Sequence, residues 1–165
     1  MTVSRARDMI FGYCLLNDWS ARDVQKWEYV PLGPFTSKNF ATSISPWVVP
    51  AEALEPGFRC DTSAGGSGAE AQVDPRPLSY LRDEEYGSYD VCLSVAIQGE
   101  GMEAPAVVTR SHYRNVYWSA AQLLVHHSVT GCNFRAGDLL GTGTISGSEE
   151  GSFGSMLELC WNGTR

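Results

Sequence analysis

Three polar side chains and a carboxylate stand close together in the stretch NDWSARDVQKWEYVPLGPF, residues 17–35. On a helix that begins early in this stretch, Arg22, Gln25 and Tyr29 fall at positions i, i+3 and i+7 and share one face. Asp18 directly precedes that helix. Arginine and glutamine present fixed N–H donors, so beside a carboxylate they can orient a polarised oxygen. The spacing equally fits an ordinary amphipathic helix with a solvated polar face, and both interpretations stay open.

Two further charged residues are candidates of unequal strength. Lys38 stands in a segment of Pro, Gly, Ser and Thr residues, where a lone lysine is usually a surface residue. Glu158 lies in SMLELCW, residues 155–161, whose alternating pattern predicts a strand buried on both faces. A carboxylate there must be paired, or desolvation raises its pKa. Such a residue suits the partner of a catalytic base, and a structural salt bridge is the alternative.

Aromatic residues interrupt the charges of the first stretch. Trp19, Trp27 and Phe35 would be unusual on a purely solvated surface, and so many charges would be unusual in a core. We expect these three side chains to pack and to fix the corner that carries the polar groups. The mixture is typical of the wall of a site, where packed neighbours hold polar groups in place.

The elements that position these residues are predicted from periodicity and breakers. The nearly all-apolar run Met9–Leu16 predicts a strand buried on both faces. Ser20 followed by Asp23 has the form of a capping box that opens a short helix. Pro31 and Gly33 must end that helix. The candidate donors therefore lie where a strand turns into a helix.

Beyond this corner, strands predominate. SPWVVP, residues 45–50, predicts a short strand, and strict alternation over residues 89–97 predicts a strand that turns toward a second one near residues 106–110. Helical spacing over residues 116–127 predicts a second helix, with Gly131 as its C-cap. The sequence contains no internal repeat and indicates a single domain.

Composition narrows the class of protein. The 165 residues are long enough for one domain with a core, and their formal net charge is −7. Only 12 lysines and arginines are present, and they are scattered, which argues against nucleic acid and against an anionic membrane surface. No apolar run approaches the ~20 residues of a membrane span. Five cysteines without a CxxC pair predict reduced, mostly buried thiols in a cytoplasmic protein.

Motifs for organic cofactors and for histidine-based metal sites are weak. GTGTISG, residues 141–147, lacks the lysine and the spacing of a P-loop. His126 and His127 are adjacent on the predicted helix, so their side chains diverge and cannot hold one ion together. His112 stands alone in the sequence. Structural roles are the favoured interpretation for all three histidines.

Segments along almost the whole chain resemble the fumarylacetoacetate hydrolase family. The motif NDxxARD is typical of the family as a whole, and its continuation QKWEYVPLGPF resembles the branch that acts in tyrosine and phenylalanine catabolism. The other matching segments are SPWVVP, DPRPLSYL, VYWSAAQLLVHHSV and GDLLGTGTISG with FGSMLEL. The resemblance implies a mainly β fold with α, the mixed β-roll of the family's C-terminal domain. It also implies hydrolysis of the carbon–carbon bond of 4-fumarylacetoacetate to fumarate and acetoacetate.

The resemblance further implies a metal site. Asp18 corresponds to a metal ligand, and Lys38 and Thr42 match residues near a second ion. Calcium (Ca2+) or magnesium (Mg2+) is implied, to polarise a diketone substrate through oxygen ligands. Glu158 resembles the acid that orients the family's catalytic histidine.

Donors and substrate contacts follow from the same resemblance. Arg22, Gln25 and Lys38 resemble the donors that hold the developing oxyanion and the leaving group. Tyr29 and Thr144 resemble substrate contacts. Hydrolysis between two carbonyls needs such donors, because the departing fragment carries the negative charge of an enolate.

Several parts of the family pattern are missing from this sequence. The family's catalytic histidine and its three other acidic ligands lie upstream of the matched region, and its N-terminal domain is absent. We therefore expect residues 1–165 to be a partial C-terminal catalytic domain, with a flexible insert at about residues 59–73, and a homodimer in the complete form. One alternative is a truncated, non-catalytic chain that keeps the oligomer surface and weak diketone binding. Another is an acylpyruvate hydrolase of the wider family, which the aromatic run around Trp27 and Tyr29 disfavours.

Overall fold

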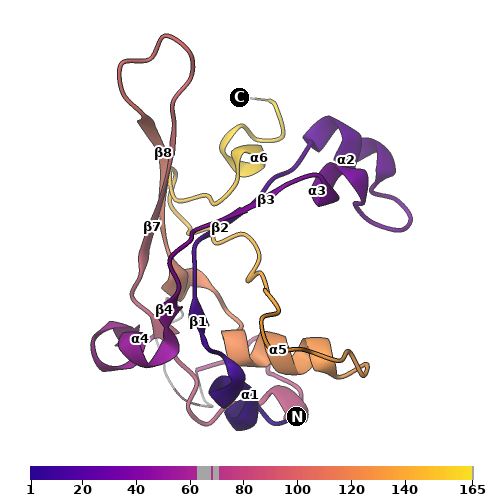
Figure 1. Cartoon of the computed structure of the whole chain (residues 1–165), viewed down its shortest axis with the longest axis vertical. Helices are drawn as coiled ribbons and strands as arrows, with labels where there is room; N and C mark the ends of the chain where they lie inside the picture. The colour runs from indigo at the N-terminus through magenta and orange to yellow at the C-terminus, as the bar shows by residue number, and fades with distance from the viewer. Residues whose placement is uncertain (63–67, 69–70, 165) are drawn as a thin grey trace. The chain divides into compact units, whose positions relative to one another are not determined.

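Figure 1 draws the helices and strands of the protein, whose structure is a computed structural model. The residues described are 1–62, 68 and 71–164. The chain divides into two compact units. We call Gly12–Ala51 the corner unit, because it holds the strand-to-helix corner predicted above, and we call Met1–Phe11 with Glu52–Arg165 the core unit.

The corner unit contains two short antiparallel sheets, each of two strands. β1 (Gly12–Tyr13) pairs with β4 (Val49–Pro50), and β2 (Leu16–Asp18) pairs with β3 (Thr42–Ile44). Between β2 and β3 the chain forms two helices, α2 (Arg22–Glu28) and α3 (Thr36–Asn39), which lie next to each other (Figure 1). Gly12 is required at its position, because a Cβ there would collide with the carbonyl group of Val49.

The core unit is built from helices and two further antiparallel strand pairs. Its helices are α1 (Val3–Met9), α4 (Ala51–Phe58, which starts in the corner unit), α5 (Ala120–Ser128) and α6 (Met156–Leu159), with one-turn 3-10 helices η1 (Ser79–Leu81) and η2 (Tyr113–Asn115). Its strands are β5 (Arg59–Cys60), paired with β6 (Ser88–Tyr89), and β7 (Cys92–Ile97), paired with β8 (Ala106–His112). The β7–β8 hairpin contains an irregularity between Val95 and Ala96.

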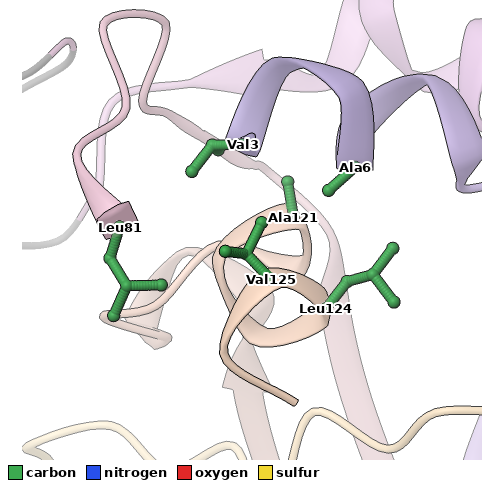
Figure 2. Close-up of a cluster of buried hydrophobic side chains, with 6 residues drawn as sticks. All are labelled: Val3, Ala6, Leu81, Ala121, Leu124 and Val125. Carbon is green, nitrogen blue, oxygen red and sulfur yellow. The ribbon is translucent and has the colours of Figure 1, made fainter. Parts of the chain in front are cut away.

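A cluster of buried apolar side chains joins α1, η1 and α5, as Figure 2 shows. Its members are Val3, Ala6, Leu81, Ala121, Leu124 and Val125. Truncating a buried leucine such as Leu124 to alanine typically costs about 2–5 kcal/mol. The cluster is therefore the main apolar contribution to the stability of this unit.

Helix α5 begins where a capping box is formed. The Ser119 hydroxyl accepts from the Gln122 backbone N–H at 3.2 Å, and the Gln122 side chain accepts from the Ser119 backbone N–H at 2.9 Å. The predicted helix is confirmed, although it starts at Ala120 and not near residue 116. The C-cap is Val129 and not the expected Gly131, which lies two residues later, has a φ of +84° and donates to the Ser128 carbonyl at 3.0 Å.

The mixed fold class is confirmed: small antiparallel sheets combine with helices. The hairpin predicted over residues 89–97 and 106–110 is also confirmed, although its first strand begins at Cys92, and Tyr89 belongs to β6. Of the strand predicted at residues 45–50, only Val49–Pro50 forms. The insert expected at residues 59–73 falls largely on positions outside the described residues.

Two strand predictions were wrong. The run Met9–Leu16 does not form one buried strand, since Met9 ends α1 and the two strands that follow are short and partly or fully exposed. Within the described residues, each strand pairs with a single neighbour, and neither strand contains a buried residue. Residues 155–161 contain a helical turn, α6, and not a strand, because Ser155 caps it by accepting from the Glu158 N–H at 3.3 Å.

Two smaller expectations also fail. The capping box expected at Ser20 and Asp23 is not formed: α2 has Ala21 at its N-cap without a side-chain cap, and Asp23 accepts only from the next residue's N–H. The five cysteines are free thiols as predicted, but Cys92 and Cys132 are exposed and the others half-buried. Among the described residues, no helix combines the length and apolar character needed to cross a membrane.

Candidate active site

The antiparallel pair β2–β3 brings the three residues predicted near a metal ion together. Its register places Asp18 directly opposite Thr42, so both side chains project from the same face. Lys38, from α3, reaches the same place, and its Nζ donates to Asp18 Oδ2 at 2.8 Å. Both members of this ion pair are partly exposed, which limits its stabilising effect to below ~1 kcal/mol. The main effect of this ion pair is therefore to fix the Lys38 ammonium next to the Asp18 carboxylate.

Helix α2 carries the predicted donors in the expected arrangement. The Arg22 Nη1 donates to Gln25 Oε1 at 2.9 Å, so the two side chains form one unit on a shared face. The oxygen of the Gln25 amide accepts this hydrogen bond. The Gln25 Nε2 group is therefore the part of the amide that can donate to another acceptor. Tyr29 follows at the C-cap of α2, and its side chain is exposed.

The aromatic residues do not fix this corner, contrary to our expectation. Trp27 is 89% exposed, Phe35 52% and Trp19 48%. Of these three rings, only that of Trp19 makes a hydrogen bond within the part of the chain that the structure describes, in which its Nε1 donates to the hydroxyl of Ser43, on β3, at 2.8 Å. Packing of these rings within the corner unit therefore cannot be what orders it.

A carboxylate that sequence reasoning overlooked holds the corner instead. Glu28, the last residue of α2, accepts hydrogen bonds from the backbone N–H groups of Phe35, Thr36 and Ser37 and from two of their hydroxyls. The bond from the Ser37 hydroxyl, aided by these N–H groups, outweighs desolvation and lowers the pKa of Glu28 to about 2. The signal in the sequence was a glutamate preceding a turn that leads into Thr-Ser.

The turn that brings Glu28 to α3 is defined by a glycine. Gly33 has a φ of +95°, in the left-handed region that other residues rarely adopt. Its N–H donates to the Tyr29 carbonyl at 2.8 Å, which closes the end of α2. The predicted stop at Pro31 and Gly33 is thus confirmed, and the reversal returns the chain toward the end of the same helix.

The remaining two candidates lie in the core unit. Glu158 accepts from the Ser146 hydroxyl at 2.8 and 3.0 Å and from the Ser155 hydroxyl at 2.8 Å. It is therefore hydrogen-bonded but lies on a helical turn, so the predicted burial on a two-faced strand was wrong. Thr144 lies in the irregular segment just before Ser146, and its side chain is exposed.

The histidines have local partners in the core unit. His126 Nδ1 lies 2.9 Å from the Tyr80 hydroxyl, and the two rings stack. His112 Nδ1 lies 3.3 Å from an Asp90 carboxylate oxygen. These contacts agree with the structural roles favoured from the sequence.

The residues described do not fit a complete calcium or magnesium site. No group of three or more His, Cys, Asp or Glu side chains among them is placed to hold an ion. Lys38 has only donors and cannot ligate a cation, which leaves the Asp18 carboxylate and the Thr42 oxygen. Since Ca2+ takes six to eight oxygens and Mg2+ six, a site at this place would need further ligands.

Comparison with known proteins gives one family model and several relatives that match nearly the whole chain. Residues 1–159 match the family model described as Fumarylacetoacetate (FAA) hydrolase C-terminal. The chain is 53% identical over 163 residues to the protein named Fumarylacetoacetase of Rattus norvegicus and 54% identical to that of Bos taurus. It is 52% identical over 165 residues to the Fumarylacetoacetase of Dictyostelium discoideum. These matches cover 99–100% of the chain but only 36–37% of the relatives' length.

Proposed function

This chain belongs to the fumarylacetoacetate hydrolase family, and from that premise we propose that it supplies part of the catalytic centre of a hydrolase that cleaves 4-fumarylacetoacetate to fumarate and acetoacetate. The observation that carries the proposal is the sequence identity of 53–54%, over 163 residues of this chain, to relatives whose name denotes that activity. The chain spans little more than a third of those relatives, so the activity is proposed for a protein that also holds the rest of the family's sequence.

The proposed reaction explains why donors gather in the corner unit. Water adds to the ketone carbon of the fumaryl group itself, which forms a carbon–oxygen bond and a tetrahedral oxyanion. Collapse of this intermediate breaks the carbon–carbon bond, releases fumarate, and leaves the bonding electron pair on acetoacetate as an enolate. A proton then completes acetoacetate. Both anionic oxygens need N–H donors that are already in place.

Arg22 and Gln25 are the proposed donors to the departing enolate. The Arg22–Gln25 hydrogen bond of 2.9 Å fixes the amide so that Nε2, and not Oε1, serves as the donor. A donor oriented before the reaction stabilises developing charge without reorganisation. Lys38 adds a positive charge beside Asp18, where an oxygen that gains charge is attracted.

The groups that activate water are proposed to come from outside the corner unit. A general base with a pKa near the working pH is needed, and Glu158 is the proposed acid that orients it. The two serine hydroxyls that donate to Glu158 hold this carboxylate in one orientation. A Ca2+ or Mg2+ ion, if one is bound with ligands from elsewhere, would polarise the substrate, and Asp18 would be one of its oxygen ligands.

A chimera tests the proposal directly. The 163 matched residues of the rat relative are replaced by those of this chain, and hydrolysis of 4-fumarylacetoacetate is followed at steady state. We expect turnover of 4-fumarylacetoacetate, and a much lower kcat/KM for an acylpyruvate. A folded chimera that prefers the acylpyruvate would support the wider family's activity instead. A folded chimera that hydrolyses neither compound would contradict the proposal.

A further inference from the structure

We infer that Glu28 is a positioning residue of this site: its carboxylate holds the first turn of α3 and thereby places the Lys38 ammonium against Asp18. This inference rests on the proposed function for the role of Lys38. It adds a residue that touches neither substrate nor any reacting atom and acts through another side chain.

The carboxylate of Glu28 is saturated by the start of α3. Its Oε1 accepts from the N–H groups of Phe35 at 2.7 Å and Ser37 at 2.9 Å, and from the Ser37 hydroxyl at 2.5 Å. Its Oε2 accepts from the Thr36 N–H at 3.2 Å and the Thr36 hydroxyl at 2.8 Å. Five hydrogen bonds from three consecutive residues fix this turn in position and in orientation.

Helix α3 has no other cap. It is four residues long, far below the length at which a helix is stable by itself, and Phe35 at its N-cap provides no side-chain hydrogen bond. The first N–H groups of any helix need partners, and Glu28 supplies them here. Ser37 is fully buried, and its carbonyl accepts from the Ala21 N–H at 2.9 Å, which ties α3 to the start of α2 as well.

Lys38 follows immediately after this anchored turn. Its own N–H donates to the Phe35 carbonyl at 3.0 Å, and its Nζ reaches Asp18 Oδ2 at 2.8 Å. An exposed ion pair is too weak to order a loop by itself, so the position of the Lys38 backbone must be set by other contacts. The contacts of Glu28, together with the Ala21–Ser37 backbone hydrogen bond, set this position, because they hold the residues just before Lys38.

A double-mutant cycle in the rat-based chimera separates this role from a general effect on stability. We expect Lys38→Ala to lower kcat by about 10²–10³, as for other lost donors. Glu28→Ala should lower kcat by about tenfold or more when Lys38 is present but less than about twofold in the Lys38→Ala background, since residues that act through one another are not additive. Glu28→Gln, which keeps one acceptor oxygen, should lie between wild type and Glu28→Ala. Equal losses in both backgrounds would show that Glu28 only stabilises the fold and would overturn the inference.

A second measurement does not depend on activity. Hydrogen exchange in the 165-residue chain reports the amides of Lys38 and Asn39, which donate to the Phe35 carbonyl. We expect Glu28→Ala to abolish their protection, whereas Asp23→Asn, an acid-to-amide change on the same helix, should leave it intact. Unchanged protection in Glu28→Ala would refute the inference even if the chimera proved active. Lost protection combined with an inactive chimera would refute the proposed function and leave the anchoring of α3 by Glu28 standing.

Discussion

Replacing Arg22 by alanine should slow the proposed hydrolysis far more than it weakens substrate binding. The change removes the guanidinium and also frees Gln25 Oε1, to which Arg22 donates at 2.9 Å, so the Gln25 amide loses its fixed orientation. Loss of one donor aimed at developing charge typically lowers the rate by about 10²–10³. At about 1.4 kcal/mol per factor of ten, this corresponds to about 3–4 kcal/mol of transition-state stabilisation.

Steady-state kinetics of the rat-based chimera measure this effect. We expect kcat to fall by two to three orders of magnitude, with KM changed less than about threefold, because the donor acts mainly in the transition state. Lys26→Ala is the matched control, since it removes the same charge from an exposed position of the same helix. If Arg22→Ala kept near-full turnover, or if Lys26→Ala were equally slow, the polar face of α2 would be a solvated surface and the donor role would be refuted.

Three other perturbations give distinct results. Glu158→Gln in the chimera should lower kcat by about tenfold or more, since a neutral amide supports a charged base poorly, and a rate equal to wild type would exclude that role. Calorimetric titration of the 165-residue chain with Ca2+ should show weak binding or none, because one carboxylate cannot supply six oxygens, and sub-micromolar affinity would contradict this. The pKa of Glu28 lies at about 2, below its ordinary 4.5, so its contribution to stability is complete above pH 4.5 and is lost as the pH falls toward 2. Urea unfolding over that pH range should therefore show a steeper loss of unfolding free energy in wild type than in Glu28→Gln. Parallel plots of unfolding free energy against pH for the two proteins would contradict the lowered pKa of Glu28.

The sequence predicted those elements whose local signals agree with one another. Strict alternation predicted the β7–β8 hairpin, and helical spacing predicted α5. The stop at Gly33 likewise followed from backbone chemistry that only glycine adopts easily. Where breakers and periodicity point the same way, little is left for distant contacts to decide.

Other elements could not be read from periodicity alone. The pattern at residues 155–161 fits a strand and a short helix equally, and the Ser155 hydroxyl decides for the helix. A serine three residues before a glutamate is itself a capping signal, which alternation had overshadowed. The run Met9–Leu16 failed for a different reason, since its apolar residues predicted burial on both faces that short, two-stranded sheets do not provide.

The shared face of Arg22 and Gln25 was predictable from the sequence, but the contacts that hold the candidate residues in place were not. Helical spacing alone puts Arg22 and Gln25 on one face. The contact of Asp18 with Lys38 depends on the pairing of β2 with β3 and on a turn held by hydrogen bonds between residues far apart in the sequence. The role of Glu28 was hidden because its partners lie seven to nine residues later. The sequence favours aromatic packing as the source of order in this corner, whereas the structure shows a buried serine and a carboxylate that accepts five hydrogen bonds.

The most direct test of the central claim is a crystal structure of the chimera with acetoacetate bound. We expect one acetoacetate oxygen to accept hydrogen bonds from Arg22 and from Gln25 Nε2 at about 2.7–3.2 Å, with the Lys38 ammonium close to the same ligand. Acetoacetate bound elsewhere, with the side chains of Arg22 and Gln25 directed into solvent, would contradict it.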